Sequence, residues 1–270
     1  MSQTVPVPVV VPCYRCSLTL ERAVESVAAQ SSLPAELILV DDFSNDATVK
    51  LLEALAARHE PGWIKIKCLD QNVGAGSARN VGWEAATQPF VAFLDADDAW
   101  HPEKLTIQYA YMRAHPDVAV SGHHHRFLRQ NIAPNWKLAE AGAKTITKWP
   151  MLLSNKFVTP SVMIRRDVTH RFVESQRHME DHMLWLQVLF GGGGVVKLGP
   201  ELAAIYKEPF GARGLSAQIW LMERGELKNY HRLFKAGFIK SHEFAALCVY
   251  SLLKCARRLL IYGGYLRWKK

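Results

Sequence analysis

The sequence contains few cysteines and no apolar run long enough to cross a bilayer. Its 270 residues include five cysteines, an odd number with irregular spacing (Cys13, Cys16, Cys68, Cys248 and Cys255). The N-terminus lacks the charged region, apolar core and cleavage site of a signal peptide. We therefore expect a cytosolic, reduced protein without structural disulfides.

The spacing Cys13-Tyr14-Arg15-Cys16 would suit a redox centre or half of a zinc site. A second C-x-x-C pair, which a zinc site would need, is absent from the sequence. We interpret the two cysteines as incidental thiols on a loop.

Basic residues outnumber acidic residues, which gives the chain a formal net charge of +8 and a pI of about 9.3. This balance favours anionic partners such as nucleic acid, sugar nucleotides or a membrane surface. Charge alone does not choose among them.

Apolar periodicity predicts alternating strands and helices in the first half of the chain. The expected strands are 5–11, 36–40, 63–69, 90–94 and 118–120, and the expected helices are 17–30, 46–56, 75–86 and 102–114. Such alternation is typical of an α/β fold with a mostly parallel sheet and helices on both faces.

The second half is less regular. We expect a loop and short strand at 159–164, a strand at 195–198, and helices at 178–190, 215–235 and 241–262. His123, His124 and His125 follow an expected strand, where alternate residues face opposite ways and cannot all bind one metal. We interpret the three histidines as part of a partly solvated segment. One of them could line a cleft.

Three polar clusters follow expected strands: Pro12 to Tyr14, Asp41-Asp42, and Asp95-Ala96-Asp97-Asp98. Ligands bind at the carboxyl ends of the strands in such sheets. The acidic loop would place three carboxylates together, which suits Mg²⁺ or Mn²⁺ and the phosphate oxygens that these ions also bind. A solvated turn or a helix cap is the alternative for this loop alone.

Further motifs lie on either side of that loop. Asp42 could accept a hydrogen bond from a base or ribose, and Asp46 could cap a helix. The segment from Asn72 to Gly82 has glycines that allow close approach of the backbone, and Arg79 within it could face phosphate. Its glycine spacing is not that of a dinucleotide-binding G-x-G-x-x-G motif.

In chain order, the sequence contains Pro12-x-Tyr14, Val40-Asp41-Asp42-x-Ser44-x-Asp46, Asn72-x-Gly74-x-x-x-Ala78-Arg79-Asn80-x-Gly82, Asp95-Ala96-Asp97-Asp98 and Glu180-Asp181. This set resembles the GT-A fold glycosyltransferases of family 2. The resemblance covers most of residues 5 to 210. It implies an inverting, non-processive transferase, because the Q-x-x-R-W element and membrane spans of processive synthases are missing.

The resemblance also implies a role for each matching residue. The nucleotide-sugar site would contain Pro12, Tyr14, Asp41, Asp42, Asn72, Gly74, Arg79, Asp95, Ala96, Asp97 and Glu180. Asp42 would accept from the base, Asp95 and Asp97 would contact ribose and metal, and Asp98 could share the metal. Asp181 would be the catalytic base, although acids in a first helical turn are also favoured by the helix dipole. Lys207 or Arg213 would supply positive charge to a loop over the diphosphate.

The implied organisation is a GT-A domain at 1–210, with a nucleotide-binding half at 1–115 and an acceptor-binding half at 116–210. Residues 211–270 would form a helical, basic extension. Lys254, Arg257 and Arg258 alternate there with apolar residues, and no acidic residue follows Glu243. This pattern suits a helix lying on an anionic membrane, with packing on the domain or a dimer contact as alternatives.

The expected function is metal-dependent sugar transfer from a nucleotide diphosphate sugar, most simply a UDP-sugar, to a glycan or lipid-linked glycan in bacterial surface polysaccharide synthesis. A nucleotidyltransferase would need a glycine-rich basic loop after the first strand, which Pro12-Cys13-Tyr14 does not supply. A nucleic-acid binder would need a recognition motif, so no nucleic-acid partner is expected. A non-catalytic sugar-nucleotide binder would not need Asp97 and Asp181. The expected location is cytoplasmic, on the inner membrane surface.

Overall fold

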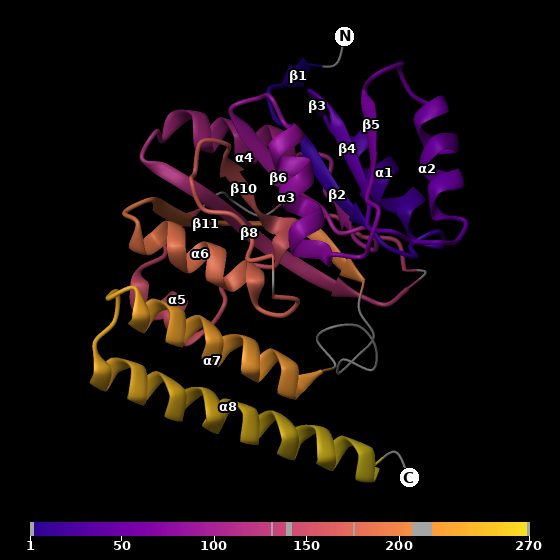
Figure 1. Cartoon of the computed structure of the whole chain (residues 1–270). Coiled ribbons are helices and arrows are strands. Elements are labelled where there is room, and N and C mark those ends of the chain that lie inside the picture. The colour runs from indigo at the N-terminus through magenta and orange to yellow at the C-terminus, as the bar shows by residue number, and fades with distance from the viewer. Residues whose placement is uncertain (1–2, 131, 139–141, 175, 207–217, 269–270) are drawn as a thin grey trace.

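A computed structural model describes residues 3–130, 132–138, 142–174, 176–206 and 218–268 (Figure 1). The expected roles of Lys207 and Arg213 fall outside these residues. The described helices are α1 (Leu20–Ala28), α2 (Thr48–Ala57), α3 (Ala75–Ala85), α4 (Lys104–Ala114), α5 (Lys148–Leu153), α6 (Glu180–Phe190), α7 (Ile219–Lys235) and α8 (Ser241–Trp268), with a 3₁₀ turn at Thr159–Ser161.

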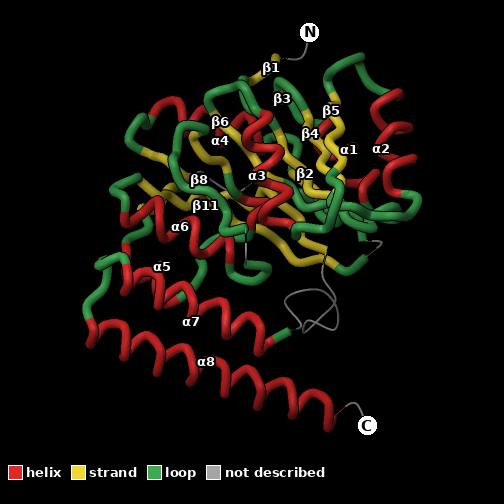
Figure 2. The backbone as a smooth tube through the Cα atoms, in the orientation of Figure 1, coloured by secondary structure: helices red, strands yellow, loops and turns green. Residues whose placement is uncertain are grey.

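One sheet of nine described strands forms the centre of the molecule, in the order β5-β4-β2-β6-β10-β8-β11-β7, with β9 paired to β11 (Figure 2). These strands are β2 (Val9–Cys13), β4 (Leu37–Asp41), β5 (Ile64–Cys68), β6 (Phe90–Phe93), β7 (Ala99–Trp100), β8 (Val118–Leu128), β9 (Ala143–Thr145), β10 (Met163–Arg165) and β11 (Gly194–Tyr206). The short strands β1 (Gln3–Val5) and β3 (Ser32–Pro34) pair separately.

The predicted mostly parallel sheet is confirmed. The strands β5, β4, β2, β6, β8 and β11 point in one direction, and β10, β7 and β9 oppose them. Because β2, β4 and β6 are parallel neighbours, their carboxyl ends bring three separate loops to one edge.

The sheet has an apolar core on each face, as its buried strands require. Val9, Val11, Leu37 and Leu39 meet α1, α2 and α4 on one face. Alternate residues of the same strands, including Val10 and Ile38, meet α3, α5, α6, α7 and α8 on the other. Helices therefore cover both faces, as predicted.

Close packing of α3 on the sheet explains why one position of the Asn72–Gly82 motif is a glycine. A Cβ at Gly82 would lie 2.3 Å from Cγ1 of Val10. Glycine at this position lets the helix approach β2, so this residue serves packing.

Three strand predictions had the wrong bounds. Residues 5–11 do not form one strand, since β1 ends at Val5 and β2 begins at Val9; Pro6 and Pro8 lack the N–H groups that a continuous ladder needs. The strand predicted at 118–120 continues to Leu128 as β8 and pairs along its length with β11. The predicted strand at 195–198 is likewise only part of β11.

The C-terminal helices form an antiparallel hairpin below α5 and α6, with α8 outermost (Figure 1). The inner surface of α7 and α8 belongs to the same core as α3 and α6, through Tyr230, Leu233 and Leu247. The predicted helices at 178–190, 215–235 and 241–262 correspond to α6, α7 and α8, although 215–217 lie outside the described residues.

Candidate active site

The ends of β2, β4 and β6 place the three predicted polar clusters side by side. Cys13 is the pairing partner of Asp41, and Pro12 that of Val40. Pro12 is half-buried and Tyr14 is 46% exposed, so the tyrosine ring is open to a ligand at this edge. The structure thus brings Pro12 and Tyr14 beside Asp41 and Asp42.

The buried carboxylate of Asp41 organises its own loop. It accepts hydrogen bonds from the backbone N–H of Ser44, at 3.1 Å, and from the Ser44 hydroxyl. The hydroxyl oxygen of Ser44 in turn accepts from the backbone N–H of Arg15, at 3.0 Å. Asp41 therefore joins the β4 loop to the β2 loop that presents Tyr14.

Asp42 is buried and bound to the glycine-containing loop. One carboxylate oxygen accepts from the Val73 N–H at 2.7 Å, and the other from the Gly74 N–H and the Asn72 side chain, both at 2.9 Å. Gly74 has a φ of +91°, which glycine adopts without strain. The expected hydrogen bond from a base to Asp42 stays a prediction. The base would donate to carboxylate lone pairs that the three bonds to the loop do not occupy.

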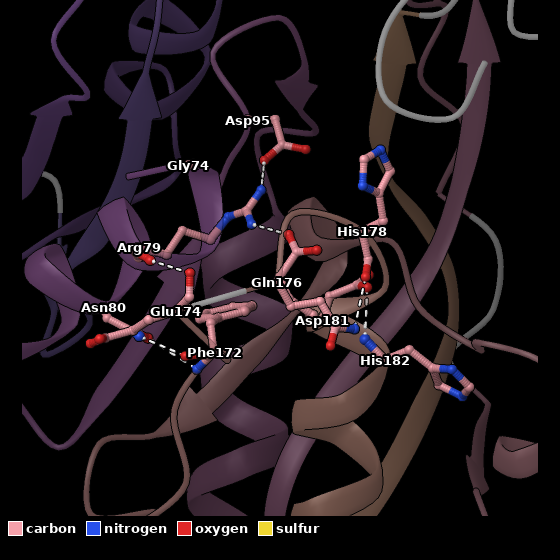
Figure 3. A network of polar contacts seen from close by, with 12 residues as sticks. Gly74, Arg79, Asn80, Asp95, Phe172, Glu174, Gln176, His178, Asp181 and His182 are labelled. Atoms are coloured by element: carbon pink, nitrogen blue, oxygen red, sulfur yellow. Dashed lines mark hydrogen bonds and ion pairs between the residues drawn. The ribbon is translucent and has the colours of Figure 1, made fainter. Parts of the chain in front are cut away.

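Arg79 is a buried cation between two carboxylates (Figure 3). Its guanidinium lies 2.7 Å from an oxygen of Asp95 and 3.5 Å from an oxygen of Glu180. Burial alone would lower the pKa of Arg79, but the charges of Asp95 and Glu180 outweigh it and raise the pKa. The arginine therefore joins the end of β6 to the start of α6, and two of its buried nitrogens, Nε and one terminal nitrogen, make no hydrogen bond.

The neighbouring residues of α3 hold the segment that precedes α6. The Asn80 side chain donates to the Phe172 carbonyl at 2.8 Å and accepts from the Phe172 N–H at 3.0 Å (Figure 3). A Cβ at Gly76 would lie 2.9 Å from Glu180 Cγ. The Asn72–Gly82 motif thus also positions the later acidic pair. The sequence alone did not indicate this positioning role.

The acidic pair begins α6, immediately after Met179, whose φ is +61°. Glu180 is buried, whereas Asp181 is partly exposed. Burial first, and then the charge of Asp181, raise the pKa of Glu180 to about 7, while Arg79 opposes the rise. Glu180 is therefore paired with Arg79 in the interior, and Asp181 is the more exposed carboxylate of the two.

The acidic loop has the geometry of a metal site. Asp95, Asp97 and Asp98 each offer a carboxylate oxygen within 4.8 Å of the other two. Asp97 is exposed, Ala96 is buried, and Asp98 is buried with one oxygen accepting from the Tyr206 N–H at 2.9 Å. An all-oxygen set of this kind fits Mg²⁺ or Mn²⁺, with Asp97 the most open of the three.

Two residues that the sequence analysis missed support this loop. Arg22 on α1 donates to the Asp97 carbonyl and lies 3.6 Å from the centre of the Tyr206 ring. Both line a cavity of about 400 Å³ with Trp100 and Trp136. Their partners are distant in sequence, so no local pattern could have revealed them.

The three histidines lie on a partly solvated strand, as predicted. His123 is fully buried on β8, where burial lowers its pKa well below the ordinary value, whereas His124 is exposed and His125 half-buried. A strand alternates buried and exposed residues, so one of the three enters the core. Cys13 and Cys16 are free thiols, as are the other three cysteines.

The fold is that of a GT-A transferase. A mannosyltransferase from Pyrobaculum calidifontis, solved with GDP-Man and Mn²⁺, superposes with a TM-score of 0.65 over 97% of this chain and 76% of that one, at 15% identity. The model of glycosyl transferase family 2 matches residues 9–172. The chain belongs to this family and is a glycosyltransferase.

Its relatives include enzymes named for bacterial polysaccharide synthesis. The putative teichuronic acid biosynthesis glycosyltransferase TuaG of Bacillus subtilis is 33% identical and aligns over 69% of this chain and 73% of its own. WfgD of Escherichia coli, named as a UDP-Glc:alpha-D-GlcNAc-diphosphoundecaprenol beta-1,3-glucosyltransferase, is 29% identical over 68% of this chain and 69% of its own.

The raised pKa of Glu180 predicts a stability that depends on pH. The folded state holds this proton more tightly than the unfolded chain, where the pKa is near the ordinary 4.5. Wild-type stability should therefore fall as pH rises from about 4.5 to about 7. Glu180→Gln removes this fall, so the free energy of unfolding of the variant minus that of wild type should increase by on the order of 2 kcal/mol from about pH 5 to about pH 8.

Urea unfolding in metal-free buffer at several pH values measures this difference. Glu174→Gln, at an exposed position, is the matched control and should follow wild type. Parallel stability curves for Glu180→Gln and wild type would contradict the prediction.

Proposed function

We propose that the chain transfers a sugar from a nucleotide diphosphate sugar, of the UDP class, to a hydroxyl of a glycan or lipid-linked glycan, with inversion at the anomeric carbon and a divalent metal. The observation on which this rests is the single network that joins the acidic loop to the acidic pair: Asp95 to Arg79 to Glu180. The UDP donor and the lipid-linked acceptor in the name of WfgD support the substrate class.

The donor would lie along the edge formed by the ends of β2, β4 and β6. Tyr14 would flank the base, and the loop that Asp42 holds would border the nucleotide. Asp95 and Asp97 would hold a divalent metal, and Asp98 could share it. When bound there, Mg²⁺ or Mn²⁺ would neutralise the charge that develops on the diphosphate leaving group.

Asp181 would act as the general base. Its carboxylate would accept the proton of the acceptor hydroxyl as that oxygen attacks the anomeric carbon. Attack from the side opposite the diphosphate forms the new glycosidic bond as the old bond breaks, which inverts the anomeric configuration. Glu180, paired with Arg79, would keep the base at a fixed distance from the acidic loop.

This mechanism assigns donor binding to residues 1–115 and acceptor binding to residues 116–210. The polar strand ends and Arg79 belong to the first segment, and Asp181 to the second. Residues 211–270 would form the basic extension that approaches a membrane.

We expect donor binding to require the metal. Calorimetric titration with UDP-, GDP- and dTDP-sugars in Mn²⁺ should give the lowest dissociation constant for a UDP-sugar, and EDTA should raise that constant at least tenfold, because the diphosphate would then face uncompensated carboxylates. Asp97→Asn should reproduce the effect of EDTA, and exposed Asp117→Asn should not. Metal-independent binding across the panel would overturn the proposal.

We expect Asp181→Asn to bind donor within about twofold of wild type and to lose transfer. Removing a general base typically costs about 10²–10⁴-fold in rate, so kcat measured by release of the nucleotide should fall by at least about 10²-fold. Asp117→Asn again serves as the control. Normal turnover in Asp181→Asn would exclude this residue as the base.

The outer face of α8 supports the membrane part of the proposal. Val249, Leu253 and Leu260 are 58%, 65% and 78% exposed, one above the other at helical spacing, and exposed Arg257 lies beside them. Leu247, Ser251 and Cys255 face the core instead. Among the described helices, none has the length and apolarity needed to cross a bilayer. A helix with this outer face can lie in the interface of an anionic membrane.

We expect Leu253→Glu/Leu260→Glu to lower the fraction bound to phosphatidylglycerol-rich liposomes more than tenfold in co-sedimentation, since two apolar contacts are lost and two negative charges are added. The control is Ile132→Glu/Leu138→Glu, which changes charge equally at two residues exposed on another surface. Equal binding of the α8 variant and wild type would refute membrane contact through this face.

A further inference from the structure

The side chain of Asn155, on the loop after α5, donates a hydrogen bond to the proposed base. Its Nδ2 lies 2.9 Å from Oδ2 of Asp181, while the other oxygen of Asp181 accepts from the His182 N–H at 2.7 Å. Both carboxylate oxygens are therefore held, which fixes the direction in which the carboxylate faces.

The orientation of the Asn155 amide is itself determined. Its Oδ1 accepts from the backbone N–H of Phe157 at 3.2 Å. Only the oxygen of the amide can accept this bond, so the NH₂ group must point to Asp181.

The loop that bears Asn155 is fixed by packing. The Phe157 ring fills the space above Gly122 on β8, where a Cβ would lie 2.2 Å from Cδ1 of the ring. The same ring contacts Trp185 on α6, with 6.2 Å between ring centres. The acidic pair begins α6. By packing on α6, Phe157 therefore fixes the position of Asn155 relative to Asp181.

The end of α5, just before Asn155, is capped from three other helices. His182 on α6 lies 2.7 Å from the Met151 carbonyl, Tyr230 on α7 donates to the Leu152 carbonyl at 2.7 Å, and Lys254 on α8 donates to the Leu153 carbonyl at 3.0 Å. The last carbonyls of a helix have no partner within it. These three side chains satisfy them and hold the start of the Asn155 loop.

The C-terminal hairpin also holds the other side of the base. Asn229 on α7 donates to the Met179 carbonyl at 2.8 Å and accepts from Gln176 at 2.9 Å. A Cβ at Gly225 would lie 2.5 Å from the His178 carbonyl oxygen. The backbone just before Asp181 therefore packs against α7.

We propose that Asn155 is a positioning residue that orients the Asp181 carboxylate for proton abstraction, and that α5 and the α7–α8 hairpin hold Asn155 in place. The proposal rests on the proposed function, in which Asp181 is the base. Asn155 donates to Asp181, and none of its hydrogen bonds to described residues reaches Tyr14, Asp42 or the acidic loop. Its loss should therefore lower kcat and leave donor binding unchanged.

Asn155→Asp gives the sharpest test because it keeps the shape and the acceptor for Phe157 but replaces the donor by a second carboxylate. Two carboxylates in contact hold a proton to higher pH than one. Glu180, Arg79 and His182 each interact electrostatically with Asp181, and the substitution leaves all three in place. The acid limb of the kcat–pH profile should therefore move upward by at least about 1 pH unit.

Asn155→Ala removes the donor without adding charge and should lower kcat about tenfold at neutral pH, with the KM for donor within about twofold of wild type. Asn135→Asp makes the same charge change at an exposed position and should keep the wild-type profile. Thermal unfolding checks that each variant folds.

A wild-type kcat and pH profile in both Asn155 variants would overturn this inference and leave the proposed function intact. Wild-type protein that binds no donor would overturn the proposed function and this inference together. An equal change in donor affinity and kcat would show that Asn155 acts by shaping the cleft, which also contradicts the proposal.

Discussion

The burial of Arg79 between two carboxylates is the constraint on which the rest of the site depends. An isolated buried charge is expensive, and removing one partner of a buried pair is strongly destabilising. Asp95 and Glu180 belong to elements far apart in sequence, yet both must reach the same guanidinium. The end of β6 and the start of α6 are therefore fixed relative to α3. That relationship sets where the acidic loop and Asp181 stand with respect to each other.

The acidic loop and the Asn72–Gly82 motif have several tasks at once. Asp95 pairs with Arg79, Asp98 binds the Tyr206 N–H, and Asp97 remains the exposed carboxylate. Gly82 permits close packing on β2, Gly76 makes room for Glu180, and Asn80 pins Phe172. Residues of one sequence motif thus have different roles: some are available to a ligand, and others fix the positions of the elements around the site.

The sequence was sufficient for the sheet and its polar edge, because strand periodicity and the residues that end a strand are local properties. Asp42 was correctly placed at that edge, but its hydrogen bonds to Asn72, Val73 and Gly74 were not foreseen. The full burial of His123 could not be assigned from the sequence, since burial of one strand residue depends on what packs above it. Neither Arg22 nor Asn155 belongs to a recognisable pattern, because each acts on a residue brought close only by folding.

The C-terminal hairpin has different surfaces on its two sides, and the difference has a physical consequence. On the inner side, Glu226 is buried and accepts from Ser251 and Lys254 at 2.9 and 2.5 Å, and the hydroxyl oxygen of Tyr230 lies 2.8 Å from it. Burial alone would raise the pKa of Glu226, but the bond to Lys254 and its charge lower it. Lys254 also caps α5, so the same ammonium group balances the buried acid and holds the helix that precedes Asn155.

Truncation before α8 would remove Lys254 and Ser251 and leave Glu226 without its cation, which costs several kcal/mol for a buried pair. A shortened chain could therefore lose activity through displacement of α5, whatever the outer face of α8 binds. Substitutions at Leu253 and Leu260 avoid this ambiguity, because these side chains are exposed and belong to neither the buried ion pair nor the core. The inner face of α8 thus helps to position α5 and, through it, the proposed base. The outer face of α8 is the surface proposed to contact the membrane.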